Sequence, residues 1–272
     1  MSDISDFAST TQVGGHTVIL RTPEGHLLKP IEYSAEAEFY YSPPSSLLSC
    51  MPVCYALHPY TEQFTLKIVQ FLSQCSKDQG CKADLFRKLA EHLPGRNYLH
   101  VLEMEDVTAG MSRPCVLDLK FCDLGETEEK REYVRKKYKG TTLLEFGFLY
   151  TGMQYFIDDV LNSHSKYDVY LLSVPQTRDL TRKFFNSEYS RSPALNLIVE
   201  KVRDVVRCLE NTPDYRFFSS SLLVAYDASE PTRTVVKLID FGRAGRVEGT
   251  GLDTESITSL ANFIEFIDEI AS

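Results

Sequence analysis

The two residues best placed to do chemistry are Asp118 and Lys120, in the segment RPCVLDLKFC at residues 113–122. The positions around them are mostly apolar, and side chains two residues apart in a strand point to the same face of a sheet. A carboxylate and an ammonium group would therefore leave the strand together. Burying two charges is costly unless they pair or meet a ligand. The spacing fits either an ion pair at a strand end or a site for a charged ligand.

A second carboxylate, Asp240, closes the apolar run TVVKLID at residues 234–240. An aspartate at the end of such a run often caps a helix or forms a turn. In phosphotransferases the same position supplies a carboxylate to Mg²⁺, which prefers oxygen ligands. The preceding apolar run begins near Ser221, and we expect the two runs to pair as an antiparallel hairpin.

A lysine lies near the end of a predicted hairpin at residues 17–30, followed by a predicted helix at residues 33–40. The lysine is Lys29, and the helix offers Glu36 and Glu38. Taken alone, Lys29 is typical of a surface lysine. Kinases, however, fix the ammonium that holds nucleotide phosphates by pairing a strand lysine with a glutamate of the next helix. We predict that Lys29 pairs with Glu36.

A highly charged helix is predicted at residues 128–138, EEKREYVRKKY. Lys130 and Lys137 are seven residues apart and therefore lie on one helical face. Such a run is typical of a solvated surface. Convergent cations shortly after the Asp118 strand are equally consistent with a phosphate-binding helix.

The composition limits the classes of function. The chain has 272 residues and a net charge of −9, which argues against a general nucleic-acid or membrane-surface binder but permits a local basic pocket. No run approaches the roughly 18 apolar residues of a membrane span. The N-terminal residues are polar, so no signal peptide is predicted and the seven cysteines are expected to be reduced. A zinc site at Cys50, Cys54 and His58 is disfavoured, because no CxxC pair occurs and prolines interrupt the segment.

Four of these segments resemble signatures of the inositol polyphosphate kinases, the family of the trisphosphate 3-kinases, the multikinases and the hexakisphosphate kinases. They occur in the order expected of the family: LKP with Lys29, PxxxDxK from Pro114 to Lys120, SSLL at residues 220–223 and IDF at residues 239–241. One element departs, because the glycine that closes PxxxDxKxG is Cys122 here. The resemblance extends over residues 13–270.

The resemblance implies an α+β, two-lobed, kinase-like fold with antiparallel sheets and an inserted helical substrate-binding segment. Residues 1–12 would form a flexible tail. Residues 13–107 would form the N-terminal lobe, with the nucleotide phosphates and the hinge. Residues 108–272 would form the C-terminal lobe, with the inositol phosphate-binding segment at about 123–190.

The resemblance also implies ATP and Mg²⁺ as cofactors and assigns a role to each site residue. Nucleotide binding falls to Lys29 positioned by Glu36, to the backbone of Glu105 and Val107 at the hinge, and to Asp118 at the ribose. Asp240 would hold the metal, Ser221 would help at the metal or phosphates, and Lys120 would lie beside the transferred group. The substrate-binding residues would be Lys120, Lys130, Lys137, Gln154, Arg178 and Arg243.

The function expected is an ATP-dependent inositol polyphosphate kinase. Three sequence features favour a hexakisphosphate kinase, which makes diphosphoinositol phosphates. They are the motif VLDLK, the three serines before the leucines, and GMQ with Gln154. A multikinase acting on tris- to pentakisphosphates is the alternative. Cys122, and Thr177 in place of a family glycine, leave open an inositol phosphate-binding pseudokinase.

LIDFG also suggests a protein, choline or aminoglycoside kinase, but neither GxGxxG nor HRD is present. The partner expected is the inositol polyphosphate, with no nucleic acid and no membrane. The location expected is the cytoplasm, with the nucleus as a second compartment.

Overall fold

The computed structural model describes residues 19–66, 68, 97–121, 127–185 and 193–270, together with the backbone of Ala8 and Ser9. These residues form two compact units. The first comprises the described parts of His16–Ser42 and Val53–Asp106, and the second comprises Pro43–Pro52 and the described parts of Val107–Ser272. The chain therefore enters the second unit at Pro43, returns to the first at Val53, and leaves it after Asp106. The sequence also predicts a helix at residues 83–92, and these residues lie outside the described part of the chain.

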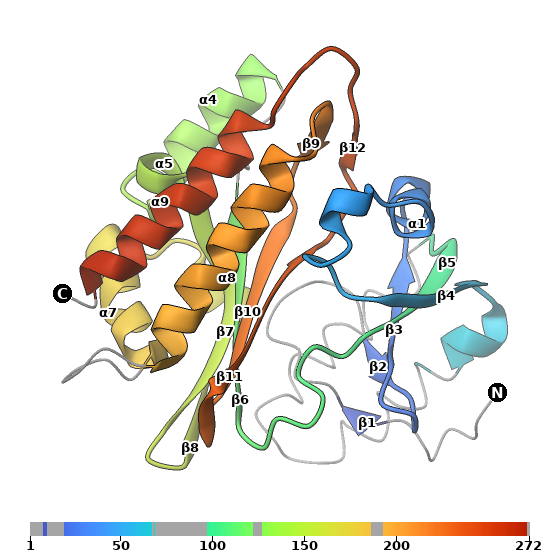
Figure 1. Ribbon diagram of the computed structural model, residues 1–272, viewed down its shortest axis with the longest axis horizontal. Coiled ribbons are helices and arrows are strands. Elements are labelled where there is room, and N and C mark those ends of the chain that lie inside the picture. The colour runs from blue at the N-terminus through green and yellow to red at the C-terminus, as the bar shows by residue number, and fades with distance from the viewer. Residues whose placement is uncertain are drawn as a thin grey trace. The chain divides into compact units, whose positions relative to one another are not determined.

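The first unit is built on an antiparallel sheet with the strand order β1-β2-β3-β5-β4 (Figure 1). Its strands are β1 (Ala8–Ser9), β2 (Leu20–Arg21), β3 (Leu27–Ile31), β4 (Cys54–Pro59) and β5 (His100–Met104). Gly25, with φ of 89°, forms the turn between β2 and β3, where a residue without Cβ is favoured. From their sequence, residues 42–60 are predicted to be mostly loop. The structure corrects this prediction, because β4 pairs with β5 at the edge of the sheet.

Helix α1 (Ser34–Tyr41) follows β3 in this unit. Its apolar residues Ala37, Phe39 and Tyr40 are buried, and so is Glu36. Burial of these side chains stabilises a helix of only eight residues, too short to be stable alone in water.

The second unit contains a five-stranded antiparallel sheet with the order β11-β10-β6-β7-β8 (Figure 1). Its strands are β6 (Pro114–Phe121), β7 (Phe148–Ile157), β8 (Val160–His164), β10 (Ser221–Asp227) and β11 (Glu230–Ile239). The strand that contains Asp118 and Lys120, β6, lies at the centre. A small separate sheet pairs β9 (Tyr215–Phe217) with β12 (Ala244–Arg246).

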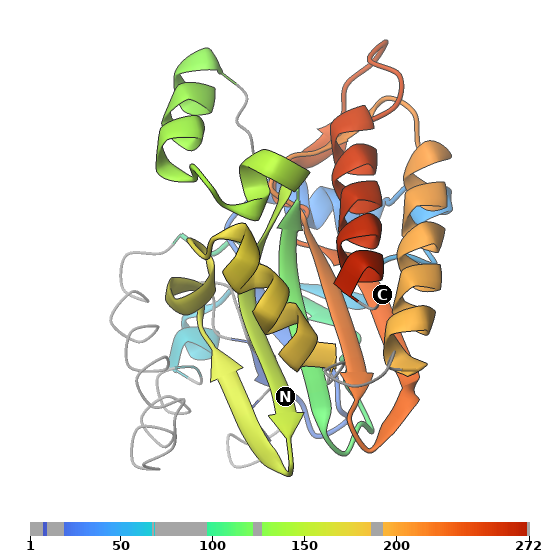
Figure 2. The same cartoon turned by 90° about the vertical axis from the view of Figure 1, so that its left-hand side faces the viewer.

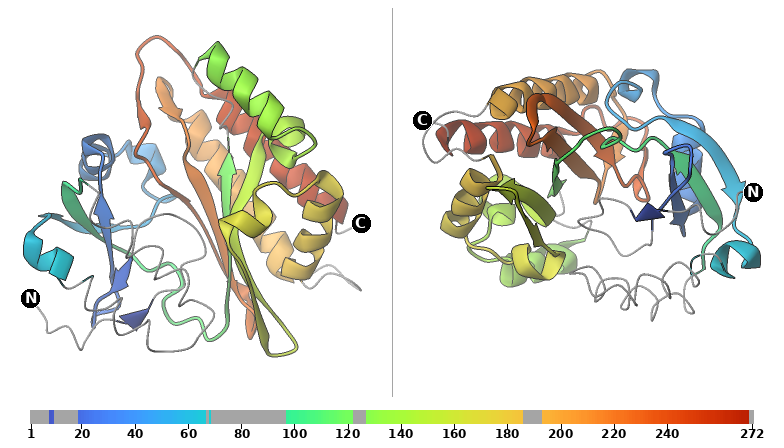
Figure 3. Two further views of the ribbon diagram at one scale, coloured as in Figure 1. Left: turned by 180° about the vertical axis from the view of Figure 1, so that it is seen from behind. Right: turned by 90° about the horizontal axis from the view of Figure 1, so that it is seen from below.

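Three long helices cover one face of this sheet (Figures 2 and 3). They are α7 (Val174–Phe185), α8 (Pro193–Glu210) and α9 (Thr254–Ile270). The ring of Phe148 on β7 packs edge-on against Phe263 and Phe266 of α9, with centroids 5.2 and 5.3 Å apart. Phe121 of β6 pairs directly with Phe148, so it lies on the same face. The odd-numbered residues 117, 119 and 121 of β6 therefore face the helices, and the even-numbered residues face away from them.

The remaining helices of this unit are short: η2 (Ser45–Leu47), α4 (Glu128–Lys137), α5 (Thr142–Phe146) and α6 (Lys166–Val169). From the sequence alone, the segment from residue 143 to residue 156 is predicted to form strands, and it includes most of α5. The residues of α5 instead form a helical turn that ends at Gly147, whose φ is 80° and where a Cβ would lie 2.3 Å from the Ser259 hydroxyl. Only glycine fits this close approach to α9. Among the described residues, no helix is long and apolar enough to cross a membrane.

Candidate active site

The central strand β6 presents Asp118 and Lys120 on the face of the sheet that the long helices leave uncovered. Asp118 pairs with Leu223 and Lys120 pairs with Ser221 on the neighbouring strand β10. Residues directly opposite in an antiparallel pair share a face. Lys120, Ser221 and Asp118 therefore project from one small area of sheet, as the two-residue spacing predicted.

Asp240 completes this group because β11 pairs with the same end of β10. Ser221 is opposite Ile239, and Asp240 is the next residue along the chain. The φ of Asp240 is 62°, in the left-handed region where aspartate is tolerated better than most residues. Strand and turn together bring Asp240 beside Asp118, although 122 positions separate them in the sequence.

The electrostatics of Asp118 show how closely these groups interact. Asp118 is fully buried, and this burial, together with the negative charge of Asp240, raises its pKa from 3.8 to about 6. Hydrogen bonds from the hydroxyls of Thr151 and Ser221 and the positive charge of Lys120 act in the opposite direction. Atom Oδ1 of Asp118 is buried and has no hydrogen-bond partner among the described residues. The site therefore holds an acid that lacks full compensation for its charge.

This pair of acids fits a divalent cation such as Mg²⁺. Two neighbouring carboxylates, one with an orphaned oxygen, repel each other until a cation or a proton neutralises them. Within the described part of the chain, no group of three His, Cys, Asp or Glu side chains is arranged to hold a metal. Mg²⁺ does not require one, because it keeps several waters and completes its octahedron with one or two carboxylates and ligand phosphates.

The first unit contains the predicted lysine–glutamate pair. The Nζ of Lys29 donates a hydrogen bond to Oε1 of Glu36 at 2.8 Å, and both side chains are largely buried. Glu38, the other acid of α1, is exposed. The pairing of Lys29 with Glu36 is therefore confirmed, and the structure gives the reason for the choice: Glu36 is on the buried face of α1.

The predicted hinge contacts involve Glu105 and Val107, at the junction of the two units. The N–H of Glu105 donates to the carbonyl of Val53 at 2.9 Å, and the N–H of Val53 donates to Oε2 of Glu105 at 3.1 Å. The next residue, Asp106, forms an ion pair with Arg21. The N–H of Glu105 is therefore already bonded within the protein. The nucleotide contacts expected of the Glu105 and Val107 backbone would have to use the Glu105 carbonyl and the Val107 N–H, and they stay a prediction.

Helix α4 presents both predicted lysines, in different surroundings. Lys130 is exposed. Lys137 lies over the rings of Tyr133, Tyr138 and Tyr170, with Nζ 5.0–5.6 Å from the three centroids. Hydrogen bonding to Tyr138, and then to Tyr133, raises the pKa of Lys137. Lys137 is exposed as well, and the three rings lie at distances typical of cation–π contacts with its ammonium group.

The position of α4 follows from its one buried residue, Val134. Val134 packs with Leu143 and Leu149 in a small apolar cluster. Leu149 is the partner of Lys120 across the β6–β7 pair. Helix α4 is therefore anchored at the Lys120 end of β6.

One predicted substrate residue, Arg178, does not lie at this face. Arg178 lies on α7, where Nη2 contacts Oε2 of Glu269 at 2.7 Å and the guanidinium stacks on Phe266 of α9. This places Arg178 among the helices, on the other side of the sheet from Lys120, so the prediction of a substrate contact is corrected. From the sequence alone, Asp179 or Thr181 is predicted to begin a helix. The structure corrects this prediction, because α7 already begins at Val174.

Gln154 is on the same face as Asp118 but is 3% exposed. Its Nε2 donates to the carbonyl of Pro114, the first residue of β6, at 2.9 Å. Its Oε1 is buried and has no hydrogen-bond partner among the described residues, so its substrate contact stays a prediction. Arg243, three residues after Asp240, is exposed and forms no ion pair within the described residues, so its substrate contact stays a prediction.

One residue of the site was not identified from the sequence. Thr151 lies at an irregularity of the β6–β7 pairing, and its hydroxyl donates to the backbone carbonyl of Asp118 at 3.1 Å. A threonine in an apolar strand is ordinary in composition, so no sequence signal singles it out. It became identifiable only once the register of β7 on β6 was known.

The chain resembles known proteins in sequence. Residues 101–268 match the family described as "Inositol polyphosphate kinase". Among curated proteins, human inositol hexakisphosphate kinase 2 is 30% identical over 164 residues, which covers 57% of this chain and 38% of that protein. Human inositol polyphosphate multikinase is 28% identical over 170 residues, covering 60% of this chain and 40% of that protein. The chain thus spans about two fifths of the length of the curated relatives it matches.

Solved structures show the same fold. A structure from a study of inositol phosphate multikinase aligns with a TM-score of 0.54 and 27% identity, over 62% of this chain and 85% of that one. The multikinase Ipk2 of Saccharomyces cerevisiae, solved with ADP and Mn²⁺, aligns with a TM-score of 0.62 and 18% identity, over 91% of this chain and 99% of that one. Together with the antiparallel sheets and the helices of the two units, these likenesses establish the α+β, kinase-like fold.

Proposed function

Because the chain belongs to the inositol polyphosphate kinase family, we propose that it transfers the γ-phosphoryl group of ATP to an inositol polyphosphate. The observation that carries the proposal is that Asp118, Lys120 and Ser221 share the face of the second sheet opposite the long helices, with Asp240 near enough to raise the pKa of Asp118. Phosphoryl transfer needs little covalent participation by the protein. It depends on positioning and on neutralising charge on the phosphoryl oxygens.

The acids of the group suit the metal side of this reaction. Asp240 would hold Mg²⁺, which when bound neutralises charge on the nucleotide phosphates. Asp118, with its free Oδ1, would accept a hydrogen bond from a ligand hydroxyl, and the family resemblance assigns this hydroxyl to the ribose. The Ser221 hydroxyl, already directed at Asp118, would order the same region.

The cations suit the phosphate groups. Lys120 lies on the same face as the acids, at the end of β6 nearest α4, where it would neutralise charge on the transferred group. Lys130 and Lys137 would hold other phosphates of the substrate. In the first unit, the ammonium of Lys29, oriented by Glu36, would bind nucleotide phosphates.

For the substrate, we infer inositol hexakisphosphate, with a diphosphoinositol phosphate as the product. VLDLK and the three serines of residues 219–221 favour this choice. GMQ with Gln154 favours it as well. A multikinase activity on tris- to pentakisphosphates is the second candidate, and the likeness to solved multikinases favours it.

The test is product analysis by ion-exchange chromatography, with inositol trisphosphate and inositol hexakisphosphate offered in parallel with MgATP. A product eluting later than hexakisphosphate supports the proposal. Conversion of trisphosphate alone supports the multikinase. Binding of either compound without turnover would identify a pseudokinase, and turnover of choline or a serine peptide instead would overturn the family substrate altogether.

A further inference from the structure

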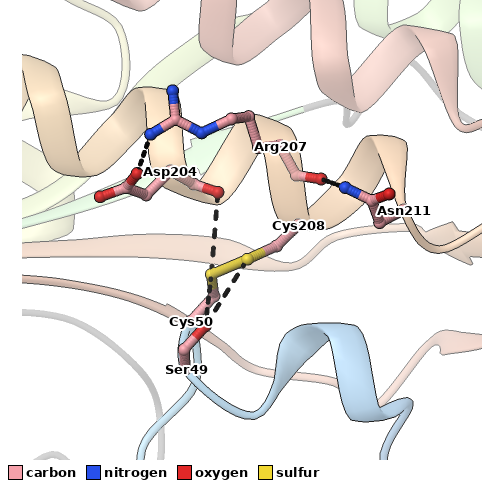
Figure 4. A network of polar contacts seen from close by, with 6 residues as sticks. All are labelled: Ser49, Cys50, Asp204, Arg207, Cys208 and Asn211. Carbon is pink, nitrogen blue, oxygen red and sulfur yellow. Dashed lines mark hydrogen bonds and ion pairs between the residues drawn. A yellow bond between two sulfur atoms is a disulfide. The ribbon is translucent and has the colours of Figure 1, made fainter.

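The structure joins two cysteines that the sequence analysis expected to be reduced. Cys50, in the segment Pro43–Pro52, forms a disulfide with Cys208 near the end of α8 (Figure 4). The two residues are 158 positions apart in the sequence, and both belong to the second unit. The bond therefore ties the segment that interrupts the first unit to a core helix of the second.

The surroundings of the two sulfurs serve the reduced form as well as the oxidised one. The carbonyl of Asp204 lies 3.9 Å from the Cys50 sulfur, where it would accept a hydrogen bond from a Cys50 thiol. The hydroxyl of Ser49 lies 3.6 Å from the Cys50 sulfur and 3.7 Å from the Cys208 sulfur. There, the Ser49 hydroxyl can donate a hydrogen bond to a thiolate on either cysteine. Such a bond stabilises the thiolate, which is both the nucleophile and the leaving group of thiol–disulfide exchange.

Access to the two sulfurs differs. Cys50 is buried at 4% exposure, whereas Cys208 is partly exposed. A soluble oxidant therefore meets Cys208 first, and Cys50 is positioned to resolve the product. Of the described thiols not in a disulfide, Cys115 is buried and Cys54 lies in the first unit.

The segment has other bonds that keep it in place when the sulfurs separate. The N–H of Leu238 donates to the carbonyl of Cys50 at 2.7 Å, and the Nζ of Lys237 donates to the carbonyl of Ser49 at 3.0 Å. Both donors are on β11, the strand that ends at Asp240. Reduction would therefore loosen the segment without releasing it, and a disulfide can re-form from nearby thiols.

We propose that Cys50 and Cys208 form a reversible redox site that responds to hydroperoxides. The Cys208 thiol takes one oxygen from the hydroperoxide, giving a sulfenic acid and water or an alcohol. The Cys50 thiol then attacks the sulfenic sulfur and expels a second water, so that two thiols lose two electrons in all. A dithiol reverses the reaction by exchange, and the segment Pro43–Pro52 is joined covalently to α8 only in the oxidised state.

The experiment starts from the full chain reduced with dithiothreitol and desalted. Hydrogen peroxide is added, free thiols are alkylated, and the digest is analysed by mass spectrometry. We expect a Cys50–Cys208 linked peptide that a second treatment with dithiothreitol removes under native conditions. The oxidised protein should unfold at a temperature higher by about 3 °C or more, and should resist chymotrypsin cleavage after the exposed Leu48.

The variants Cys50→Ser and Cys208→Ser should lose the linked peptide, the thermal shift and the protection. The matched control Cys54→Ser should retain all three. Three results would overturn the proposal: both thiols remaining free after peroxide, either one linking instead to Cys75, Cys81 or Cys122, or a bond that dithiothreitol cannot reduce in the folded protein. The last would show a permanent structural disulfide.

Discussion

Asp118 on β6 and Asp240, just after β11, lie near enough for the negative charge of Asp240 to raise the pKa of Asp118. Two acids held this close are unfavourable for the folded chain by itself. They are tolerated because nearby hydroxyls and Lys120 compensate in part. Such a cost is expected where a site is built to receive a cation and a phosphorylated ligand.

The first prediction concerns the cost of ionising Asp118. Its pKa in the folded protein, about 6, is above the ordinary 3.8, so folding favours the protonated form. The contribution of Asp118 to the free energy of unfolding is therefore fully present below about pH 4 and is lost as the pH rises through about 6. A rise from 3.8 to about 6 corresponds to about 3 kcal/mol. We therefore compare the free energies of unfolding of Asp118→Asn and of the wild type, measured in urea without divalent ions. The difference should change by about 3 kcal/mol in favour of Asp118→Asn as the pH rises from about 3.5 to about 7.5.

The control for this measurement is Asp179→Asn, which changes an exposed acid on α7. Its difference from the wild type should stay nearly constant over the same pH range. A stability difference for Asp118→Asn that does not change with pH would show that Asp118 ionises normally in the folded protein.

Asp240→Asn tests the metal ligand. We expect phosphoryl transfer to fall by at least about 100-fold, because an amide oxygen carries no charge to hold Mg²⁺. The same change removes the charge that raises the pKa of Asp118, so the Asp118 titration should move to lower pH, as followed by carboxyl NMR. Turnover close to wild type over a range of Mg²⁺ concentrations would place the metal elsewhere.

Lys120→Ala should abolish turnover while ATP still binds. Lys120 is proposed to neutralise charge that develops on the transferred group, so its loss should affect kcat far more than nucleotide affinity. Steady-state rates and calorimetric titration with a non-hydrolysable nucleotide separate the two effects. Lys183→Ala, which changes an exposed lysine on α7, should behave as the wild type. Equal losses in both variants would contradict a specific role for Lys120.

The Lys29–Glu36 pair predicts a contrast between two glutamates of one helix. Glu36→Gln should weaken nucleotide binding by about 10-fold, because the ammonium of Lys29 loses its charged partner at 2.8 Å. Glu38→Gln changes an exposed residue two positions along and should leave binding unchanged. Fluorescent-nucleotide titration measures both. Similar affinities for the two variants would indicate that Lys29 does not contact the nucleotide.

The three tyrosine rings around Lys137 predict a specific effect on the inositol phosphate. Lys137→Met keeps the apolar stem but removes the charge, and KM for the inositol phosphate should rise several-fold while KM for ATP stays constant. Lys139→Met, at an exposed position just after α4, is the matched control. An unchanged KM in Lys137→Met would mean that the rings hold the lysine for structural reasons alone.

The sequence by itself determined which side chains share a face within one element or pair across adjacent ones. The period of two put Asp118 and Lys120 together on β6, and the helix after β3 brought Glu36 to Lys29. These relationships depend on spacing along the chain and on strand and helix geometry, which a sequence carries directly.

Only the tertiary structure decided what covers each face. Arg178 has the sequence surroundings of a substrate contact, yet α9 supplies its partner Glu269, and Gln154 is buried against the Pro114 carbonyl. The disulfide between Cys50 and Cys208 likewise depends on packing across 158 residues. Periodicity reports that a surface is buried or exposed. Which distant segment meets that surface follows from long-range packing, which no local pattern encodes.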